Sequence, residues 1–529
     1  MWPDTDDPLG DNLIAEPGTP IVTPTPTSAR ARGDLCAAWY LNRLRRMSTR
    51  EVLWRSADAL RKRAWRQRQV PPGGVVDPRL AVTPHFASRL PCGALDAVPV
   101  EEVRRLRLAA DEILSGRWDV LGVTRRDMAS PDWFLDPLSG RRAPQDEYCF
   151  SINHRDQSVT GNVKQVWELS RHHHLTVLAS AYAFTGDERY AERAARHLRS
   201  WWGENPFLSG IHWTSGIETG IRLISWTWIR RLLDGWEGAP ALFERNDLGR
   251  RQIWWHQTYL AGFRSRGSSA NNHVVAEAAG QLVAALAFPW FTESTTWADE
   301  AARLLQRELA NNTFPSGVNR ELAFDYHGLV AELGLIAAIE ADLAGRPLSD
   351  TTWRSLGRSL DVTAACLDGQ IQAPRQGDSD EGRALVIAAP DSNRWSALLA
   401  LGAAIFGAPE WWPPVRPCLT SSALSALARR HPLPNRPSTR PWHFHDAGLT
   451  ILRSKPAGGP EIWCRCDSGP HGFLSIAAHA HADALSIEVR YGGTEILTDP
   501  GTYCYGADPP FRRYFRSTIG HNTLEVLGR

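Results

Sequence analysis

Three histidines and one aspartate near the end of the sequence have the types and spacing of a metal site. His479 and His481 are separated by one alanine, Asp499 follows the second of two strand-like runs, and His521 lies in "IGHNTLEV". Imidazole and carboxylate groups are zinc ligands, and a catalytic zinc usually keeps three protein ligands. His481, Asp499 and His521 would supply such a set. The spacing permits this site without requiring it, and Asp483 is a rival ligand.

A second group of polar residues lies at the expected start of a helix, in "SSANNHVVAEAAGQLVAAL". Ser268 or Ser269 can cap this helix, which places Asn272 and His273 in or near its first turn. The exposed N–H groups and the positive dipole end of a helix favour an anion. An amide and an imidazole beside them suit a carboxylate ligand. The alternative is structural, with a capping asparagine and a buried histidine.

The stretch "GVNRELAFDYHGLVAELG" predicts a further helix with a tyrosine near its start. Asp325 can cap this helix, which then opens with Tyr326 and His327. A tyrosine at a helix start is usually a packed aromatic residue. In a cleft beside a cation or an imidazole, however, its phenol can titrate low enough for general acid–base catalysis.

Acidic residues gather in "RQGDSDEGRAL", where Asp378, Asp380 and Glu381 lie between Arg375 and Arg383. Such a loop can bind a metal ion or hold the two carboxylates of a glycosidase. More often it is a polar loop that is held by hydrogen bonds from backbone N–H groups to Asp and by Asp–Arg pairs.

The bulk composition excludes several classes of protein. A chain of 529 residues is too long for one core and predicts two or three domains. The net charge of +1 gives no field that would attract a nucleic acid. The eight cysteines have neither the spacing of a disulfide framework nor that of a zinc knuckle. No apolar run is long enough to span a bilayer, and no signal peptide is recognisable, so the sequence by itself predicts a cytoplasmic location.

The elements that would position these residues fall into four regions. Residues 1–34 are rich in Pro and Thr and are expected to form a disordered tail. Residues 35–104 are expected to form a basic helical region. Residues 105–436 contain helical segments of roughly 12–20 residues. Consecutive helices form hairpins, and because no strict repeat is visible, a closed toroid is favoured over a regular solenoid.

The fourth region, residues 437–529, changes to alternating patterns that are typical of strands joined by Gly-rich turns. The patterns are "GLTILRS", "EIWCRCD", "ALSIEVRY", "TEILTD" and "NTLEVLG". They predict a second domain of antiparallel strands. The sequence stops three residues after "NTLEV", so we expect this domain to be short or truncated.

Several of these stretches, in this order, resemble the heparinase II/III-like polysaccharide lyase family. The resemblance runs over about residues 105–529 and is densest in "VWELSRHHHLTVLASAYAFTGDERY", "SANNHVVAEAAG", "ELAFDYHG", "HAHADALSIEVRYGGTEILTDPGTYCY" and "FRSTIGHNT". It implies an incomplete (α/α) toroid that is followed by an antiparallel β-sandwich. Without a signal peptide, the chain resembles the branch tied to bacterial surface-polysaccharide gene clusters, which suggests the cell envelope.

The resemblance also implies a catalytic site that the two domains share. In the family, an Asn–His pair and a tyrosine of the toroid face a histidine of the β-domain across a cleft. These positions correspond here to Asn272, His273, Tyr326 and His479. The implied reaction is β-elimination in an acidic, uronic-acid-containing polysaccharide, by removal of the C5 proton and departure of the C4 oxygen.

The family's structural zinc is bound by the second histidine of H-x-H, the aspartate before Pro-Gly and the histidine of "HN". These positions are His481, Asp499 and His521. The resemblance therefore implies that His479 is catalytic, whereas its neighbour His481 is a metal ligand. No organic cofactor is expected.

Two other classes of function remain open at this point. A toroid glycoside hydrolase would use Asp378 together with Asp380 or Glu381. A non-catalytic polysaccharide-binding protein, or an accessory protein of polysaccharide biosynthesis, would keep the cleft and tolerate the loss of Tyr326.

Overall fold

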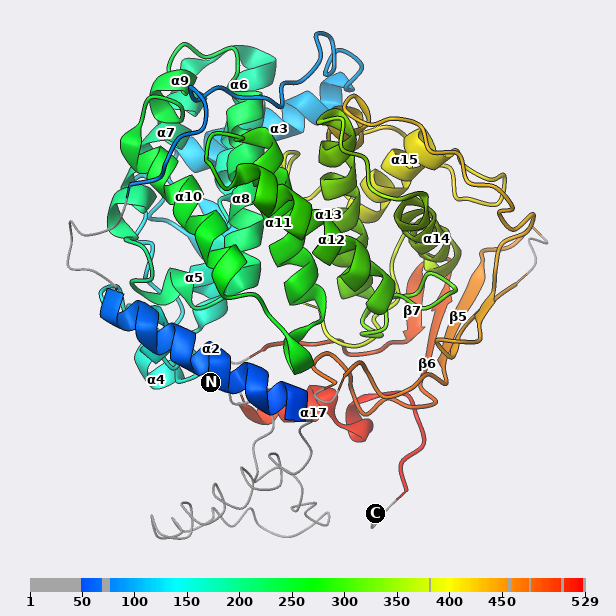
Figure 1. Ribbon diagram of the computed structural model, residues 1–529. Helices are drawn as coiled ribbons and strands as arrows, with labels where there is room; N and C mark the ends of the chain where they lie inside the picture. The colour runs from blue at the N-terminus through cyan, green and yellow to red at the C-terminus, as the bar shows by residue number, and fades with distance from the viewer. Residues whose placement is uncertain are drawn as a thin grey trace, which may run out of the picture. The chain divides into compact units, whose positions relative to one another are not determined.

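The computed structural model describes residues 49–68, 77–379, 382–454, 458–474, 477–505 and 509–526. The predicted tail 1–34 and two residues of the acidic loop, Asp380 and Glu381, lie outside these ranges. Within them, the chain is mainly helical up to Ser425 and forms its main sheet from His443 onward (Figure 1).

The described ranges contain α-helices, short 3-10 turns and β-strands. The helices are α2 (Thr49–Arg68), α3 (Val100–Leu114), α4 (Gln157–Thr160), α5 (Val163–Leu169), α6 (His173–Thr185), α7 (Glu188–Glu204), α8 (Gly216–Leu232), α9 (Ala239–Leu242), α10 (Asp247–Gly262), α11 (Asn272–Ala287), α12 (Ser294–Asn311), α13 (Phe324–Leu343), α14 (Asp350–Cys366), α15 (Arg394–Phe406), α16 (Leu419–Ser425) and α17 (Pro509–Arg516). The short 3-10 turns are η1 (Cys149–Ser151), η2 (Ile211–Trp213), η3 (Gly267–Ser269) and η4 (Thr518–Gly520). The strands are β1 (Trp118–Val120), β2 (Val123–Arg125), β3 (His443–Phe444), β4 (Leu449–Arg453), β5 (Ile462–Asp467), β6 (Ile487–Tyr491) and β7 (Thr494–Leu497).

The helix α2 belongs to a unit of its own, residues 1–75, and all other elements belong to a second unit, residues 76–529. Within α2, Lys62 pairs with Asp58 one turn earlier at 2.7 Å. This helix lies in the region 35–104 that the sequence predicts to be helical and basic. Residues 77–99 run as turns and extended chain up to the start of α3.

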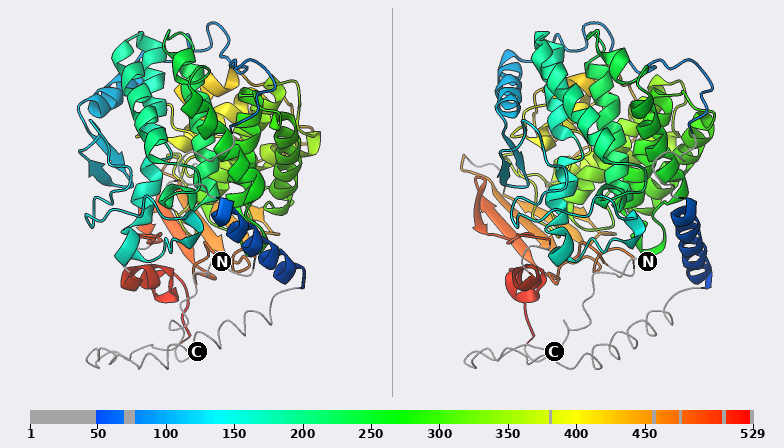
Figure 2. Two further views of the ribbon diagram at one scale, coloured as in Figure 1. Left: turned by 60° about the vertical axis from the view of Figure 1, so that its left-hand side comes forward. Right: turned by 90° about the vertical axis from the view of Figure 1, so that its left-hand side faces the viewer.

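The helices between α3 and α16 are arranged in two layers. Nearly every residue of α8, α11 and α13 is buried, so these inner helices are enclosed by protein on all sides. By contrast, α7 and α12 bury one face, and α14 is fully buried only in its second half. Each inner helix contacts the next, from α6 to α8, α11 and α13, and Figure 2 shows the helices side by side. This succession of hairpins is the (α/α) toroid that the sequence predicts. None of the helices in the described ranges has the length and apolar character that a membrane-spanning segment needs.

Two glycines bring the inner helices α8 and α11 into backbone contact. A Cβ atom added at Gly280 would collide with the backbone of Gly220, and one added at Gly220 would collide with the carbonyl of Ala276. A larger residue at either position would therefore push α11 away from α8. Since α11 begins at Asn272, this contact fixes the place of a predicted catalytic residue.

The strands after residue 440 form a five-stranded antiparallel sheet in the order β3-β4-β5-β6-β7. In the pairing of β4 with β5, Leu449 lies opposite Asp467 and Arg453 lies opposite Trp463. The first four strand patterns of the sequence are the strands β4 to β7. An antiparallel sheet after a helical toroid is the fold class that the sequence predicts.

The last strand pattern, at residues 522–526, does not form the predicted strand. The side chain of Asn522 donates a hydrogen bond to the Thr498 carbonyl at 2.9 Å, and Leu524 and Val526 are exposed. The Ile487 N–H, at the start of β6, donates to the Asn522 carbonyl at 3.1 Å, but within the described residues this contact does not continue into a strand ladder. The helix α17, which precedes this segment, was not predicted either.

The sheet packs against the end of α14 and the loop 367–379 through buried polar contacts. Trp463 Nε1 donates to the Cys366 carbonyl at 3.1 Å, and Arg490 pairs with Asp368 at 3.0 Å. Figures 1 and 2 show the sheet lying at one end of the helices. The loop that leads to the candidate site is therefore held by both helices and strands.

Candidate active site

Asn271 caps the N-terminus of α11. Its side-chain oxygen accepts a hydrogen bond from the His273 N–H at 3.2 Å, so Asn272 and His273 are the first two residues of the helix. The prediction that Ser268 or Ser269 caps this helix is wrong, because both lie in the preceding turn η3. The loop enters the helix two residues later than expected, and the asparagine there takes the capping role.

An internal carboxylate occupies the start of α11. Glu321, which is buried, accepts the backbone N–H of Asn272 at 3.0 Å and its side-chain N–H at 2.8 Å. The anion that the sequence predicts at this helix end is thus supplied by the protein itself. The amide oxygen of Asn272 is buried and has no hydrogen-bond partner among the residues described. Glu321 holds Asn272 in one orientation, and no motif in the sequence indicates this contact.

Tyr326 lies in the first turn of α13, which begins at Phe324. The residue before this helix is Ala323, and its side chain cannot act as a cap. The prediction that Asp325 caps the helix is therefore wrong. The helix starts earlier because the carbonyl of Gln376, from a distant loop, accepts the Phe324 N–H at 3.0 Å.

His327, the neighbour of the tyrosine, has a structural role. Its Nδ1 accepts the Asn319 N–H at 3.3 Å, and its Nε2 lies 3.1 Å from the Ser359 carbonyl. Burial lowers the pKa of His327 to about 4. The ring is therefore neutral near pH 7, with both nitrogens in hydrogen bonds.

His479 reaches these helix residues from the β-domain. Its ring stacks on Tyr326, with ring centres 3.8 Å apart and an angle of 18° between the planes. Its Nε2 lies 3.3 Å from the side-chain nitrogen of Asn272 and 3.5 Å from Glu321, and its Nδ1 lies 3.3 Å from Asp378. Three of the four residues named from the sequence, Asn272, Tyr326 and His479, thus meet in one buried cluster.

The fourth residue, His273, is half-buried beside Asn272. The structure adds two residues that the sequence analysis missed. The hydroxyl of Tyr505 lies 2.8 Å from that of Tyr326, and the Arg512 guanidinium lies 4.7 Å from the centre of the Tyr505 ring. Both come from the segment after the sheet, and no spacing in the sequence indicates that they reach the helices.

Asp378 joins the two histidines of the H-x-H motif. It is fully buried, accepts two hydrogen bonds of 2.6 Å from Arg512, and lies 2.8 Å from His481 Nε2. Burial by itself would raise the pKa of Asp378. The hydrogen bonds from His479, His481 and Arg512 outweigh it and hold the pKa well below 3.8. Because both oxygens are occupied, Asp378 does not face a sugar, which argues against a glycosidase role.

We expect Asp378→Asn to lower the free energy of unfolding by about 3–5 kcal/mol, because it leaves the buried charge of Arg512 opposite a neutral amide. Urea unfolding followed by circular dichroism measures this change. Glu495→Gln is the matched control, since it removes the carboxylate of a more exposed pair with Arg375 at 3.0 Å. That change should cost less than about 1 kcal/mol. Equal costs for the two substitutions would contradict the structural role of Asp378.

The three residues named as zinc ligands lie near one another. His521 Nδ1 is 2.9 Å from Asp499 Oδ2, and the ring centres of His481 and His521 are 5.2 Å apart. In the part of the chain that the structure describes, no three His, Cys, Asp or Glu side chains are placed to hold a metal ion. His481 Nδ1 and His521 Nε2 are both buried, and neither has a hydrogen-bond partner within the described residues. Two imidazole nitrogens thus remain available as ligands.

The arrangement of the cluster suits proton transfer beside an anion. A phenol and an imidazole are both groups that move protons in general acid–base catalysis, and the stacked rings of Tyr326 and His479 place one of each side by side. An amide held at a helix start, as in Asn272, can hydrogen-bond an oxyanion. These groups together fit abstraction of a proton from a carbon next to a carboxylate.

Two family models match the chain. "Heparinase II/III N-terminus" matches residues 141–382, and "Heparinase II/III-like, C-terminal" matches residues 436–529. The first range includes Asn272 and Tyr326, and the second includes His479. The chain belongs to the heparinase II/III-like family.

Curated relatives of this chain carry the name "Heparin-sulfate lyase". The protein from Bacteroides thetaiotaomicron is 24% identical over an alignment of 394 residues, and the match covers 68% of this chain and 51% of the relative. The protein from Pedobacter heparinus is 22% identical over 375 residues, with the same two coverages of 68% and 51%. The chain thus spans about half the length of the curated relatives that it matches.

Solved structures with a similar fold come from the same family. "Crystal Structure of Heparinase III" has a TM-score of 0.55 and 16% identity, and the match covers 84% of this chain and 66% of that one. A heparan sulfate lyase HepC mutant from Pedobacter heparinus has a TM-score of 0.50 and 18% identity, with coverages of 89% and 65%. These likenesses support the toroid and antiparallel sheet as the fold.

Proposed function

We propose that this protein is a polysaccharide lyase, a carbon–oxygen lyase that cleaves a uronic-acid-containing polysaccharide by β-elimination. One observation carries the proposal. Asn272 and Tyr326 from the toroid are in contact with His479 from the β-domain, although about 50 to 200 residues separate them along the chain. In a member of the heparinase II/III-like family, such a cluster at the junction of helices and sheet is the natural place for the reaction.

The first requirement of the reaction is to make the C5–H of a uronic acid acidic. This proton is far too weakly acidic unless the neighbouring carboxylate is neutralised. The side-chain nitrogen of Asn272 has two hydrogens, of which one is held by Glu321 at 2.8 Å. We infer that the second, which now faces His479 at 3.3 Å, turns to the substrate carboxylate. Glu321 then keeps the amide in place while the negative charge develops.

The second requirement is a pair of groups that move protons. A base takes the C5 proton, the electron pair left behind forms the C4–C5 double bond, and the C4–O bond breaks. The departing oxygen takes a proton from an acid. Tyr326 and an imidazole, either His479 or His273, fill the two roles, and the order depends on whether elimination is syn or anti. No water is consumed, and the product is an unsaturated uronide.

An ultraviolet absorbance assay tests this function. The C4–C5 double bond is conjugated with the carboxylate, so we expect new ultraviolet absorbance when the protein acts on a suitable polysaccharide. A panel of acidic, uronate-containing polysaccharides is the appropriate set of substrates. New reducing ends without absorbance would indicate hydrolysis and would overturn the proposal, and so would binding without cleavage of any member of the panel.

We also propose that His481, Asp499 and His521 hold a structural zinc ion. The chemistry of the donors supports this, because imidazole nitrogen and carboxylate oxygen are zinc ligands. His521 Nδ1 lies 2.9 Å from Asp499 Oδ2, so two of the proposed ligands are already side by side. His481 Nε2 lies beside the Asp378 carboxylate, and its Nδ1 has no partner among the described residues. A metal-binding histidine commonly has a carboxylate on its second nitrogen. When bound, zinc would stabilise the wall of the site that carries His479.

We expect purified protein to contain about one zinc ion per chain. Elemental analysis by mass spectrometry measures this, and His481→Ala and His521→Ala should each lose the metal. His443→Ala, at an exposed position in β3, is the control. A chelator should lower the Tm of the wild type. Protein that lacks zinc when it is purified without chelators, even after zinc is added back, would contradict the proposal.

A further inference from the structure

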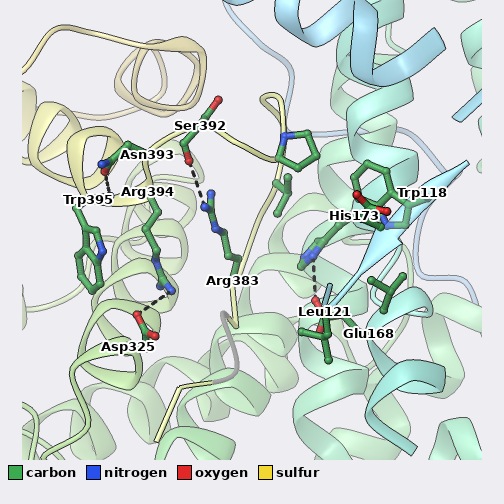
Figure 3. Close-up of a pocket in the computed structure, with 14 residues that line it drawn as sticks. Trp118, Leu121, Glu168, His173, Asp325, Arg383, Ser392, Asn393, Arg394 and Trp395 are labelled. Carbon is green, nitrogen blue, oxygen red and sulfur yellow. Dashed lines mark hydrogen bonds and ion pairs between the residues drawn. The ribbon is translucent and has the colours of Figure 1, made fainter. Parts of the chain in front are cut away.

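A pocket of about 370 Å³ lies beside the first turns of α6 and α15, outside the cluster of Tyr326 and His479 (Figure 3). This volume is within the range of small-molecule sites, roughly 300–1,000 Å³. Figure 3 shows Trp395 on one side of the pocket, Trp118 and His173 on the other, and the side chain of Arg383 between them. The proposed elimination uses none of these four residues.

His173 gives this pocket a polar group without a partner. The residue is only 6% exposed, and its Nε2 has no hydrogen-bond partner among the described residues. Its Nδ1 lies 3.7 Å from Glu168. Figure 3 shows the imidazole pointing into the pocket. An unsatisfied buried nitrogen costs free energy, so a ligand that hydrogen-bonds to Nε2 would be favoured there.

Several of the charged groups around the pocket already have partners of opposite charge, some of them outside it. Two cationic and three carboxylate side chains line it, namely Arg383, Arg394, Asp119, Glu168 and Asp325. Arg394 lies 3.9 Å from Asp325, and Glu168 pairs with Arg171, outside the pocket, at 2.6 Å. An anionic ligand would meet more carboxylates than cations, whereas a neutral ligand would disturb no pair. The balance favours a ligand without charge.

Trp118 supplies an apolar surface beside this polar group. It lies on the short strand β1, lines the pocket and is partly exposed. A flat, partly exposed indole ring packs against the apolar face of a sugar ring. A ligand with hydroxyl groups on its edge and C–H groups on its face would satisfy both Trp118 and His173.

The pocket is a neighbour of the active site. Asp325, which lines the pocket, directly precedes Tyr326 in the first turn of α13, and its carboxylate is contacted by the hydroxyl of Ser379, the residue after Asp378. The pocket and the proposed active site thus share the first turn of α13.

We propose that this pocket binds an uncharged sugar ring of the polysaccharide. His173 Nε2 hydrogen-bonds to a ring hydroxyl, and Trp118 packs against the face of the ring. The inference rests on the proposed function in one respect only, which is that this ring belongs to the same polysaccharide as the uronate that undergoes elimination.

Saturation-transfer NMR on the ligand, with the full-length chain, tests the pocket directly. The probes are glucose, galactose and N-acetylglucosamine as neutral sugars, and glucuronate as the anionic counterpart. We expect at least one neutral sugar to bind. His173→Phe keeps a flat ring but loses Nε2, and Trp118→Ala loses the indole face, so each should weaken neutral-sugar binding about 10-fold. Trp442→Ala and His443→Phe change exposed residues of the β-domain and should leave it unchanged.

The outcomes separate this inference from the proposed function, because binding needs no bond cleavage. No binding of any neutral sugar, unchanged affinity in both pocket variants, or His173-dependent binding of glucuronate in preference to neutral sugars would overturn the pocket assignment. If the elimination assay succeeds in that case, the proposed function still stands. If neutral-sugar binding depends on His173 but the protein eliminates no polysaccharide, the pocket assignment is supported and the proposed lyase function is refuted. Circular dichroism checks the fold of each variant. If His173→Phe does not fold, the binding result for Trp118→Ala decides the test.

Discussion

Tyr326→Phe is expected to lower turnover by about 10²–10⁴-fold while the fold and the binding of the polysaccharide are kept. The substitution removes a single oxygen atom. The phenyl ring can still stack on His479, whose ring centre lies 3.8 Å away, and the pair of Asn272 and Glu321 is not touched. The rate of ultraviolet absorbance increase measures turnover, and its dependence on polysaccharide concentration gives KM. We expect the loss in kcat and little change in KM.

Tyr505→Phe is the matched control for this experiment. The hydroxyls of Tyr326 and Tyr505 are 2.8 Å apart, so either substitution removes the same hydrogen bond. Only Tyr326→Phe removes the group proposed to move a proton. Tyr505→Phe should therefore stay within about 10-fold of the wild type, as expected for one neutral hydrogen bond. Full activity of Tyr326→Phe, or an equal loss in both variants, would show that the Tyr326 hydroxyl is neither the acid nor the base.

The sequence predicts a helix or strand correctly where the pattern of apolar residues reflects how that element packs. A helix such as α8 or α11 carries its own apolar spacing, and the strands β4 to β7 each alternate beside a strand that also alternates. Residues 522–526 alternate in the same way and contact the start of β6 through the Asn522 carbonyl, yet they form no strand, because pairing requires a ladder of several such contacts. Alternation describes one strand and says nothing about whether a partner exists.

The difference between local patterns and long-range partners also explains which residues of the candidate site the sequence predicts. Asn272, Tyr326 and His479 were found from motifs, and the family match covers all three positions. Glu321 and Asp378, which hold Asn272 and the two histidines in place, act through side chains whose partners are about 50 to 100 residues away in sequence. No local pattern encodes such a contact.

The two errors in helix capping have a related cause. Ser269 and Asp325 are good capping residues by type, but the true helix starts are Asn272 and Phe324. In the second case a distant carbonyl, that of Gln376, takes the first helical N–H. Propensity identifies residues that can end a helix, whereas tertiary contacts decide where it begins.

A group of buried histidines in the toroid predicts a loss of stability at mildly acidic pH. The group is His172, His174, His197, His212 and His256. Their rings pack against tryptophans, for example His172 on Trp133 at 5.7 Å and His256 on Trp226 at 4.4 Å between ring centres. Burial is the main reason why the pKa of each lies well below 6.5, and the pKa of His197 is lowered to about 3.

The direction of the effect follows from the protons bound in each state. In the folded protein these histidines stay neutral, whereas in the unfolded chain they titrate near pH 6.5. Above that pH neither state binds the protons, and the stability is fully present. Below it the unfolded state gains protons that the folded state cannot take up, so the free energy of unfolding falls by about 1.4 kcal/mol per pH unit for each histidine. Five histidines together would give a loss of about 7 kcal/mol per pH unit.

We expect this loss to unfold the toroid between about pH 6.5 and 5, because a typical domain is stable by only about 5–15 kcal/mol. Carboxylates with lowered pKa, such as Asp378, add to the loss only at still lower pH. Urea unfolding at a series of pH values gives the slope of the free energy of unfolding, and therefore the number of protons taken up. His174→Gln should reduce that number by about one. A free energy of unfolding that stays constant from about pH 7 to 5.5 would mean that these histidines take up protons equally in the folded protein and in the unfolded chain, which would contradict the prediction.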